Sequence, residues 1–251
     1  MRKHLIWMLA LATAVSVAGV AQATDSTGTD FSLLKTKVTP SKLSKTKYKS
    51  AKLFVETSTL NNTNPGTPTN PGNTPVPTSN VQLKFDKDLK FTTKGLAQCT
   101  KSLDGTTTAT ANQLCGSSKV GGGQATACIG SASPCNKVSF VVTAFNGPLK
   151  GGKPTIILHS RDDAINTTTV LVGTLDPKTN VLNVPIPPAV YALATIADFQ
   201  TTVKKSFSSK GKKYSYVSAR CSHGSFKLKG TFKYSNGDPD DHPTATSKCT
   251  N

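Results

Sequence analysis

The chain has 251 residues, with 30 Lys and Arg against 13 Asp and Glu and a formal net charge of +17. After residue 20 no stretch is long and apolar enough to cross a bilayer, which excludes a protein with several membrane spans. The length suits one all-β domain or two small domains.

Residues 1–23 have the three parts of an export signal. Met1–His4 is cationic, an apolar run follows from Leu5 to Val20, and Ala21–Ala23 fits the small-x-small cleavage rule. We therefore predict a signal peptide cleaved after Ala23 and a secreted or cell-envelope location. The alternative is an uncleaved membrane anchor, because the apolar run approaches the length that spans a bilayer.

Cleavage would remove Arg2 and Lys3 and leave 28 basic residues against 13 acidic ones. Only Arg161 and Arg220 among the remaining basic residues are arginines, which favours diffuse attraction to polyanions over bidentate phosphate recognition. Export makes nucleic acid an unsuitable partner, so anionic cell-surface polymers or polysaccharides are the expected ones. The alternative is a solvated basic surface that only keeps the protein soluble.

Residues 61–80 consist mainly of Pro, Gly, Asn and Thr, which predicts an extended, mobile loop. A linker between two domains would need a core before it, but residues 24–60 are too few and too rich in Lys to build one. We therefore expect a single domain over residues 24–251, with the loop inside it.

Period-two patterns dominate the rest of the chain and predict many short strands. Turn residues such as Asn146–Pro148 and Asn236–Gly237 separate them. The prediction is an all-β fold, an antiparallel β-sandwich of roughly nine to eleven strands. Short helical turns are expected only at 108–114 and 193–199. The predicted strands are 51–57, 81–86, 119–128, 138–145, 155–158, 170–172, 181–186, 199–207, 213–221 and 226–234.

The six cysteines all follow residue 23, and an even number in an exported chain predicts three disulfides. Six cysteines permit fifteen pairings, of which the most economical joins neighbours. That set is Cys99 with Cys115, Cys128 with Cys135, and Cys221 with Cys249. Zinc ligation is the weaker alternative, because there is no C-x-x-C pair and the histidines are not at ligand spacing.

Several segments together resemble a family of exported bacterial proteins that brings no activity, cofactor or site residues. They are PSKLSKTKYKSAKLFVET at 40–57, FDKDLKFTTKGLAQC at 85–99 before SKVGGGQA, VTAFNG at 142–147, and YVSARC at 216–221 before NGD and a final Cys. The resemblance covers 39–249. It implies export, β structure and the pairs Cys99–Cys115 and Cys221–Cys249, whereas the pairing of Cys128 with Cys135 depends on proximity alone.

No catalytic, cofactor-binding or metal-binding residue is assigned. His159 and Asp162 lie together at a strand end, but neighbouring strand residues point to opposite faces, so a polar turn is the better interpretation. A hydrolase site assembled from these two with His223 and Asp240 is the alternative. The loop Asn236–Asp241 is rich in oxygen ligands of the kind that calcium prefers, but it lacks EF-hand spacing, and a solvated hairpin loop explains it.

Lysines form the one pattern that points to a function. If their strands adjoin, they form a basic face for anionic polymers, and the alternative is that outward lysines only prevent edge pairing. The predicted function is a non-enzymatic interaction protein of the cell envelope or extracellular space. A secreted inhibitor or effector, acting through the Cys128–Cys135 ring, is a further alternative. The candidate lysines are Lys204, Lys205, Lys212, Lys213, Lys227, Lys229 and Lys233.

Overall fold

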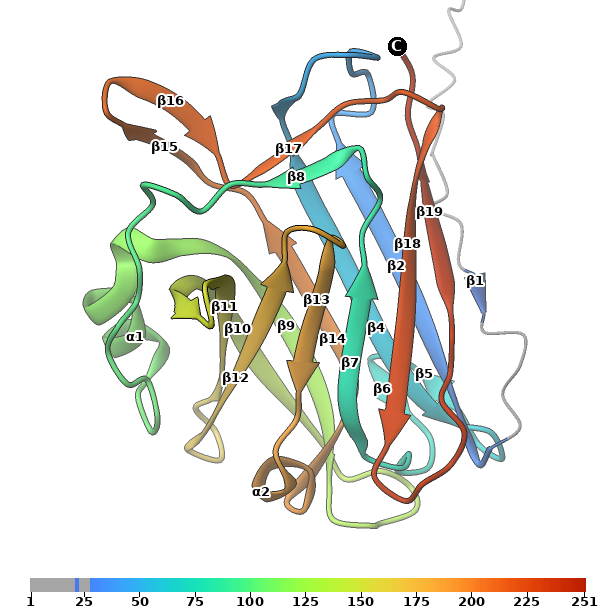
Figure 1. Ribbon diagram of the computed structural model, residues 1–251. Helices are drawn as coiled ribbons and strands as arrows, with labels where there is room; N and C mark the ends of the chain where they lie inside the picture. The colour runs from blue at the N-terminus through green and yellow to red at the C-terminus, as the bar shows by residue number, and fades with distance from the viewer. Residues whose placement is uncertain (1–20, 23–27) are drawn as a thin grey trace, which may run out of the picture.

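A computed structural model describes residues 21–22 and 28–251, whose regular secondary structure is mostly β-strand (Figure 1). Apart from Ala21 and Gln22, the predicted signal peptide and its cleavage site lie outside the described residues. The helices are α1 (Thr108–Cys115), a 3-10 turn (Gly116–Ser118) and α2 (Pro188–Tyr191). The strands are β1 (Ala21–Gln22), β2 (Asp30–Thr39), β3 (Lys49–Ser50), β4 (Lys52–Asn61), β5 (Gly66–Thr67), β6 (Asn70–Pro71), β7 (Thr78–Lys84), β8 (Leu89–Phe91), β9 (Lys119–Ile129), β10 (Lys137–Lys150), β11 (Lys153–Asp162), β12 (Thr167–Asp176), β13 (Val181–Pro185), β14 (Ala194–Val203), β15 (Ser206–Ser209), β16 (Lys212–Ser215), β17 (Val217–Ala219), β18 (Ser225–Tyr234) and β19 (Thr244–Lys248).

One large antiparallel sheet has the order β1-β2-β4-β14-β9-β10-β11-β12-β13-β7-β18-β19. Without the two-residue β1 it has eleven strands, and these curl until β19 approaches β2 (Figure 1). Because strand direction alternates across eleven strands, the first strand, β2, and the last, β19, run parallel to each other. The isolated bridge between Lys42 and Thr250, which follow these two strands in the chain, is also parallel. The predicted all-β antiparallel fold is confirmed, and the large hydrophobic core lies inside the curled sheet, with two smaller apolar clusters beside it.

Three small sheets accompany the large one. Strands β3, β17 and β8 form one of them, which crosses the upper end of the large sheet in Figure 1. The hairpin β15–β16 forms the second and projects from that end. The hairpin β5–β6 forms the third, within the predicted mobile loop. The first two small sheets therefore bring three separate lysine-rich parts of the sequence to one end of the molecule.

Alternation along each strand separates core from surface. In β18, Phe226, Leu228 and Phe232 are buried, and the lysines between them are exposed. Burying an apolar side chain of this size stabilises the fold by about 1.5–3 kcal/mol. The predicted strand at 226–234 therefore has the expected inner and outer faces.

The prediction of a helical turn at 193–199 is wrong, because this segment forms the first part of β14. The register shifts between Ile196 and Asp198, and Phe199 returns to the inner side with Ile196. A β-bulge inserts one residue and so turns a spacing of two into three, which resembles helical spacing in the sequence. The predicted helical turn at 108–114 is confirmed as α1, with Thr107 as its N-cap.

Residues 61–80 contact the loop between β9 and β10. The amide of Cys135 donates to the carbonyl of Gly72 at 2.7 Å, and the hydroxyl of Thr74 donates to the carbonyl of Ala132 at 2.6 Å. The end of this segment enters β7 at Thr78. Its mobility stays a prediction, but these hydrogen bonds hold it against the loop between β9 and β10.

The three disulfides join Cys99 to Cys115, Cys128 to Cys135 and Cys221 to Cys249, as predicted. The first fixes α1 against the strands, because both of its cysteines lie in a small apolar cluster with Phe145 and Ile157. The third ties the chain end to the segment between β17 and β18. Each closes a short loop and so lowers the entropy of the unfolded chain.

Side-chain hydrogen bonds join β2 to the β18–β19 part of the sheet. Asp241, which is buried, accepts from the amide of Ser32 and from the hydroxyl of Tyr234, both at 2.6 Å. Further along, the amide of Val38 donates to the hydroxyl of Ser247 at 3.1 Å. These bonds satisfy backbone amides of β2 that have no antiparallel partner on this side.

We expect Asp241→Ala to destabilise the fold by about 2–4 kcal/mol, because two buried donors would lose a charged acceptor. Asp240→Ala is the matched control. Asp240 is the preceding residue, and its carboxylate lies 3.8 Å from the ammonium group of Lys233 at the surface. The free energy of unfolding in urea measures both variants. Equal losses would show that Asp241 does not hold the sheet closed.

A polar row crosses the outer side of β2, β4 and β14. Glu56 accepts from Lys35 at 2.6 Å, and the buried Asp198 accepts from Ser58 at 2.8 Å and from Gln200 at 2.9 Å. Burial, together with the charge of Glu56, raises the pKa of Asp198 to about 6 despite its two hydrogen bonds. Asp198 therefore ionises in the folded state at a higher pH than in the unfolded chain.

This shift makes stability depend on pH. Between the unfolded pKa of about 3.9 and the folded pKa, the folded state holds a proton that the unfolded state has lost, so stability falls as pH rises. We expect the stability of Asp198→Asn, compared with that of the unsubstituted protein, to be higher at pH 7 than at about pH 4.5. The difference in the free energy of unfolding between the two proteins should change by on the order of 2 kcal/mol between these pH values. Urea unfolding at both pH values measures it, and a constant difference would contradict the shifted pKa.

Candidate functional site

Three lysine-rich segments, 45–49, 87–94 and 204–213, carry strands β3, β8 and β15–β16 at the upper end of the molecule in Figure 1, and we call this end the basic end. Strand β17 pairs with β3 on one side and with β8 on the other. The hairpin β15–β16 joins them, because the amide of Tyr216 donates to the carbonyl of Lys205 at 2.7 Å. Ten of its lysines are exposed and Lys205 is half-buried. The lysines of the basic end are Lys45, Lys47, Lys49, Lys87, Lys90, Lys94, Lys204, Lys205, Lys210, Lys212 and Lys213.

The hairpin β15–β16 combines these charges with aromatic rings. Phe207 and Tyr214 face each other across the two strands, and their rings stack with centroids 5.6 Å apart. Tyr214 is exposed. The segment 204–215 contains no acidic residue. The hairpin therefore presents an aromatic surface surrounded by unopposed positive charge.

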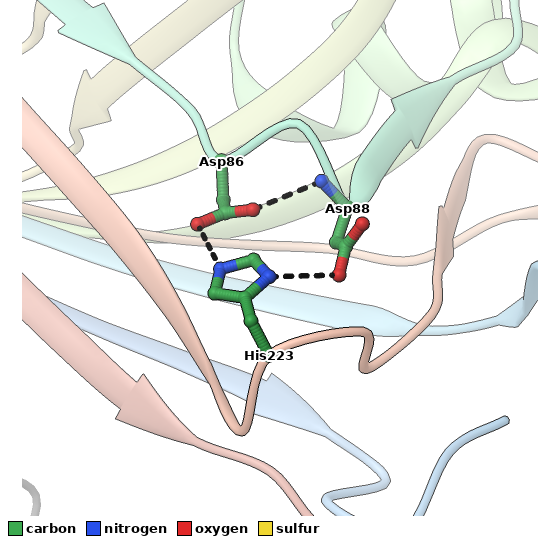
Figure 2. A group of neighbouring side chains, drawn as sticks. All are labelled: Asp86, Asp88 and His223. Carbon is green, nitrogen blue, oxygen red and sulfur yellow. Dashed lines mark hydrogen bonds and ion pairs between the residues drawn. The ribbon is translucent and has the colours of Figure 1, made fainter. Parts of the chain in front are cut away.

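Asp86, Asp88 and His223 form the one His, Cys, Asp or Glu group with metal-like proximity in the described part of the chain (Figure 2). Asp86 and Asp88 lie on the turn between β7 and β8, and His223 lies in the loop before β18. Nε2 of His223 is 3.3 Å from Asp86, and its Nδ1 is 3.2 Å from Asp88. Figure 2 shows the ring held between the two carboxylates.

The geometry of this group favours an ion cluster over a metal centre. The two carboxylates face different nitrogens of one ring. Nδ1 of His223 also lies 3.0 Å from the hydroxyl of Ser222. The carboxylates also accept from protein donors: Asp88 from Arg220 at 2.8 Å and from the amide of Ser222 at 2.7 Å, and Asp86 from the amide of Lys227 at 2.9 Å.

Asp88 is the central charge of this cluster, because it is fully buried beneath Arg220. Burial raises the pKa of Asp88, but hydrogen bonds from Ser222 and Arg220 outweigh it, and the pKa lies below its ordinary value. The guanidinium of Arg220 in turn lies 5.0 Å from the ring centroid of Tyr48. The cluster thus binds the segments that carry β3, β8 and β17 to one another.

We expect Asp88→Asn to cost about 2–4 kcal/mol at neutral pH, because Arg220 would lose its buried counter-charge. A depressed folded pKa contributes stability above the unfolded value and loses it as pH falls through the folded pKa, so the cost should shrink in acid. Denaturation at several pH values measures this. The exposed Asp104→Asn is the control, and a loss that does not change with pH would contradict an ionised Asp88.

The structure divides the seven candidate lysines into two groups. Lys204, Lys205, Lys212 and Lys213 belong to the basic end, whereas Lys227, Lys229 and Lys233 lie on the outer face of β18. Strand β18 pairs with β7 and β19, and in Figure 1 it lies away from the β15–β16 hairpin. The seven lysines therefore do not form one continuous face. The seven candidate lysines do not include those near β3 and β8, which the pairing with β17 brings beside the hairpin.

The four residues of the alternative hydrolase site have separate partners. His159 is buried and contacts the hydroxyl and carbonyl of Thr106, while Asp162 accepts from turn amides at 164 and 165. His223 lies in the ion cluster, and Asp240 is near Lys233. Within the described ranges no hydrogen bond or ion pair joins any two of the four.

The acids of the loop Asn236–Asp241 point to different partners. Asp238 accepts from the hydroxyl of Thr29 at 2.7 Å, and Asp241 accepts from Ser32 and Tyr234. These contacts fasten the loop to β2 and to the segment before it. They give it a structural role and do not gather its carboxylates around one point.

Comparison with known proteins adds no family or function, because no family model, curated protein or solved structure matches the chain. No helix in the described ranges has the length and apolar character needed to cross a membrane.

Proposed function

We propose that the protein is an exported, non-enzymatic interaction module that binds anionic polymers of a cell envelope or extracellular matrix through its basic end. The supporting observation is the convergence of three separate lysine-rich segments there. Residues 45–49, 87–94 and 204–213 carry eleven lysines. The nearest acids, Asp86 and Asp88, are held by His223 and Arg220.

The chemistry of the basic end suits a flexible polyanion. Lysine ammonium groups are strongly hydrated point charges, so they attract anionic groups without fixed bidentate geometry. Many such charges at one end produce a field that extends over about one Debye length, roughly 8 Å at physiological salt. The ring of Tyr214 adds an apolar surface on which a sugar ring or other flat group could pack.

Export is supported by two independent features. Residues 1–23 have the pattern of a cleavable signal, and the three disulfides are typical of proteins that fold in oxidising compartments. An envelope polymer rich in phosphate or carboxylate would meet the protein there. Nucleic acid is not expected as a partner in that compartment.

The test compares two triple variants with the same change in net charge. Lys210, Lys212 and Lys213→Gln removes three charges from the hairpin tip, and Lys227, Lys229 and Lys233→Gln removes three from β18. We expect the unsubstituted protein to bind immobilised dextran sulfate and to be released as salt rises from about 0.05 to 0.5 M. The hairpin variant should elute at clearly lower salt than the β18 variant.

Co-sedimentation with washed envelopes of the producing organism then tests a natural surface. Binding that fades with salt and is weakened more by the hairpin variant supports the proposal. Equal elution of the two triple variants would mean that net charge alone controls binding, and no binding to envelopes at any salt would overturn the proposal.

A further inference from the structure

The closed sheet is not completely filled. A cavity of about 120 Å³ lies inside it, lined by side chains from β4, β7, β8, β11, β12, β13, β14 and β18. A cavity needs on the order of 10–15 Å³ to hold one water, so this one has room for a small molecule. Phe91 and Tyr216 of its lining come from the segments that also carry lysines of the basic end.

The lining is apolar with a few hydroxyl groups, and it contains no ionisable side chain other than Tyr216. Its walls are formed by side chains such as those of Leu158, Leu171, Val184 and Phe199. An ion or a charged metabolite would lose its hydration in such a space without gaining a counter-charge. The ligand class is therefore uncharged and mainly apolar.

Two hydroxyl groups in the lining lack partners. Oγ1 of Thr201 is buried and has no hydrogen bond within the described residues. The hydroxyl of Tyr216 also has no hydrogen bond in that part of the chain, although the residue is only 4% exposed. Native proteins pair most buried polar groups with protein, water or ligand. The two hydroxyls are therefore free to receive a polar group from a bound molecule.

Burial raises the pKa of Tyr216, so its hydroxyl keeps its proton and can donate. Its ring lies 6.2 Å from that of Phe91, which lies 4.9 Å from the ring of Phe85. All three rings line the cavity. This aromatic group gives the space an end that suits a flat or slender molecule.

We propose that the interior cavity binds a small uncharged molecule that has an apolar body and one hydroxyl or carbonyl group, about the size of phenol. The volume is close to that of a cavity of about 150 Å³ known to bind benzene. The apolar walls would hold the body, and Oγ1 of Thr201 would pair with its polar group. This site does not depend on the proposed function of the basic end.

The experiment titrates the oxidised protein, without residues 1–23, with phenol and with benzene and follows saturable binding by calorimetry and by NMR shifts of core methyl groups. We expect phenol to bind more tightly than benzene by roughly fivefold, the effect of one net hydrogen bond. Thr201→Val keeps the side-chain shape and should reduce this preference while benzene binding stays the same. Thr202→Val, on the outer side of the same strand, is the matched control and should change neither affinity.

A second variant tests the location. Val55→Phe places a phenyl ring in the cavity and should abolish binding of both molecules, with circular dichroism confirming that the sheet is retained. No saturable binding of either molecule, or a phenol preference that survives Thr201→Val, would overturn the proposal. Dextran sulfate binding by the same variants should be unchanged, so failure here is distinguishable from failure of the proposed function.

Discussion

Closure of an odd-numbered antiparallel sheet is the constraint on which the rest of this structure depends. Eleven alternating strands bring β2 and β19 together in the same direction, so the final seam cannot use the antiparallel ladder found elsewhere in the sheet. A parallel bridge between Lys42 and Thr250, and side-chain acceptors such as Asp241, take over instead. Because this seam encloses the core, the interior cavity and both ends of the molecule depend on it.

The two proposed sites lie in different parts of the closed sheet. The basic end is at one end of it, and the cavity is inside it. The basic end gathers charge where solvent and polymers can reach it, and the ion cluster of Asp86, Asp88 and His223 fastens its segments. The interior is lined mainly by apolar side chains, with the hydroxyls of Thr201 and Tyr216 among them. Surface charge and interior shape can therefore bind different molecules without competing.

The candidate site could be predicted only in part. The period-two alternation of Phe226, Leu228 and Phe232 correctly predicts a strand with outward lysines, since alternation is a local property of the chain. It does not say which strands are neighbours. The sequence prediction therefore groups Lys212 with Lys229, whereas the fold places them on separate strands, β16 and β18. The spacing of Ile196 and Phe199 suggests a helix because a bulge imitates helical spacing, and bulges depend on the partner strand.

The sequence by itself determined the all-β class, the expectation of three disulfides with neighbours as the most economical pairing, a helical turn at α1 and the excess of lysine over arginine. These follow from local periodicity, short loop closures and composition, which need no long-range contact. Only the tertiary structure decided that the sheet closes, that residues 45–49, 87–94 and 204–213 meet at one end, and that the core keeps a cavity. Those features depend on strand order and on how side chains far apart in the chain fill a common volume, and neither is encoded within a single segment.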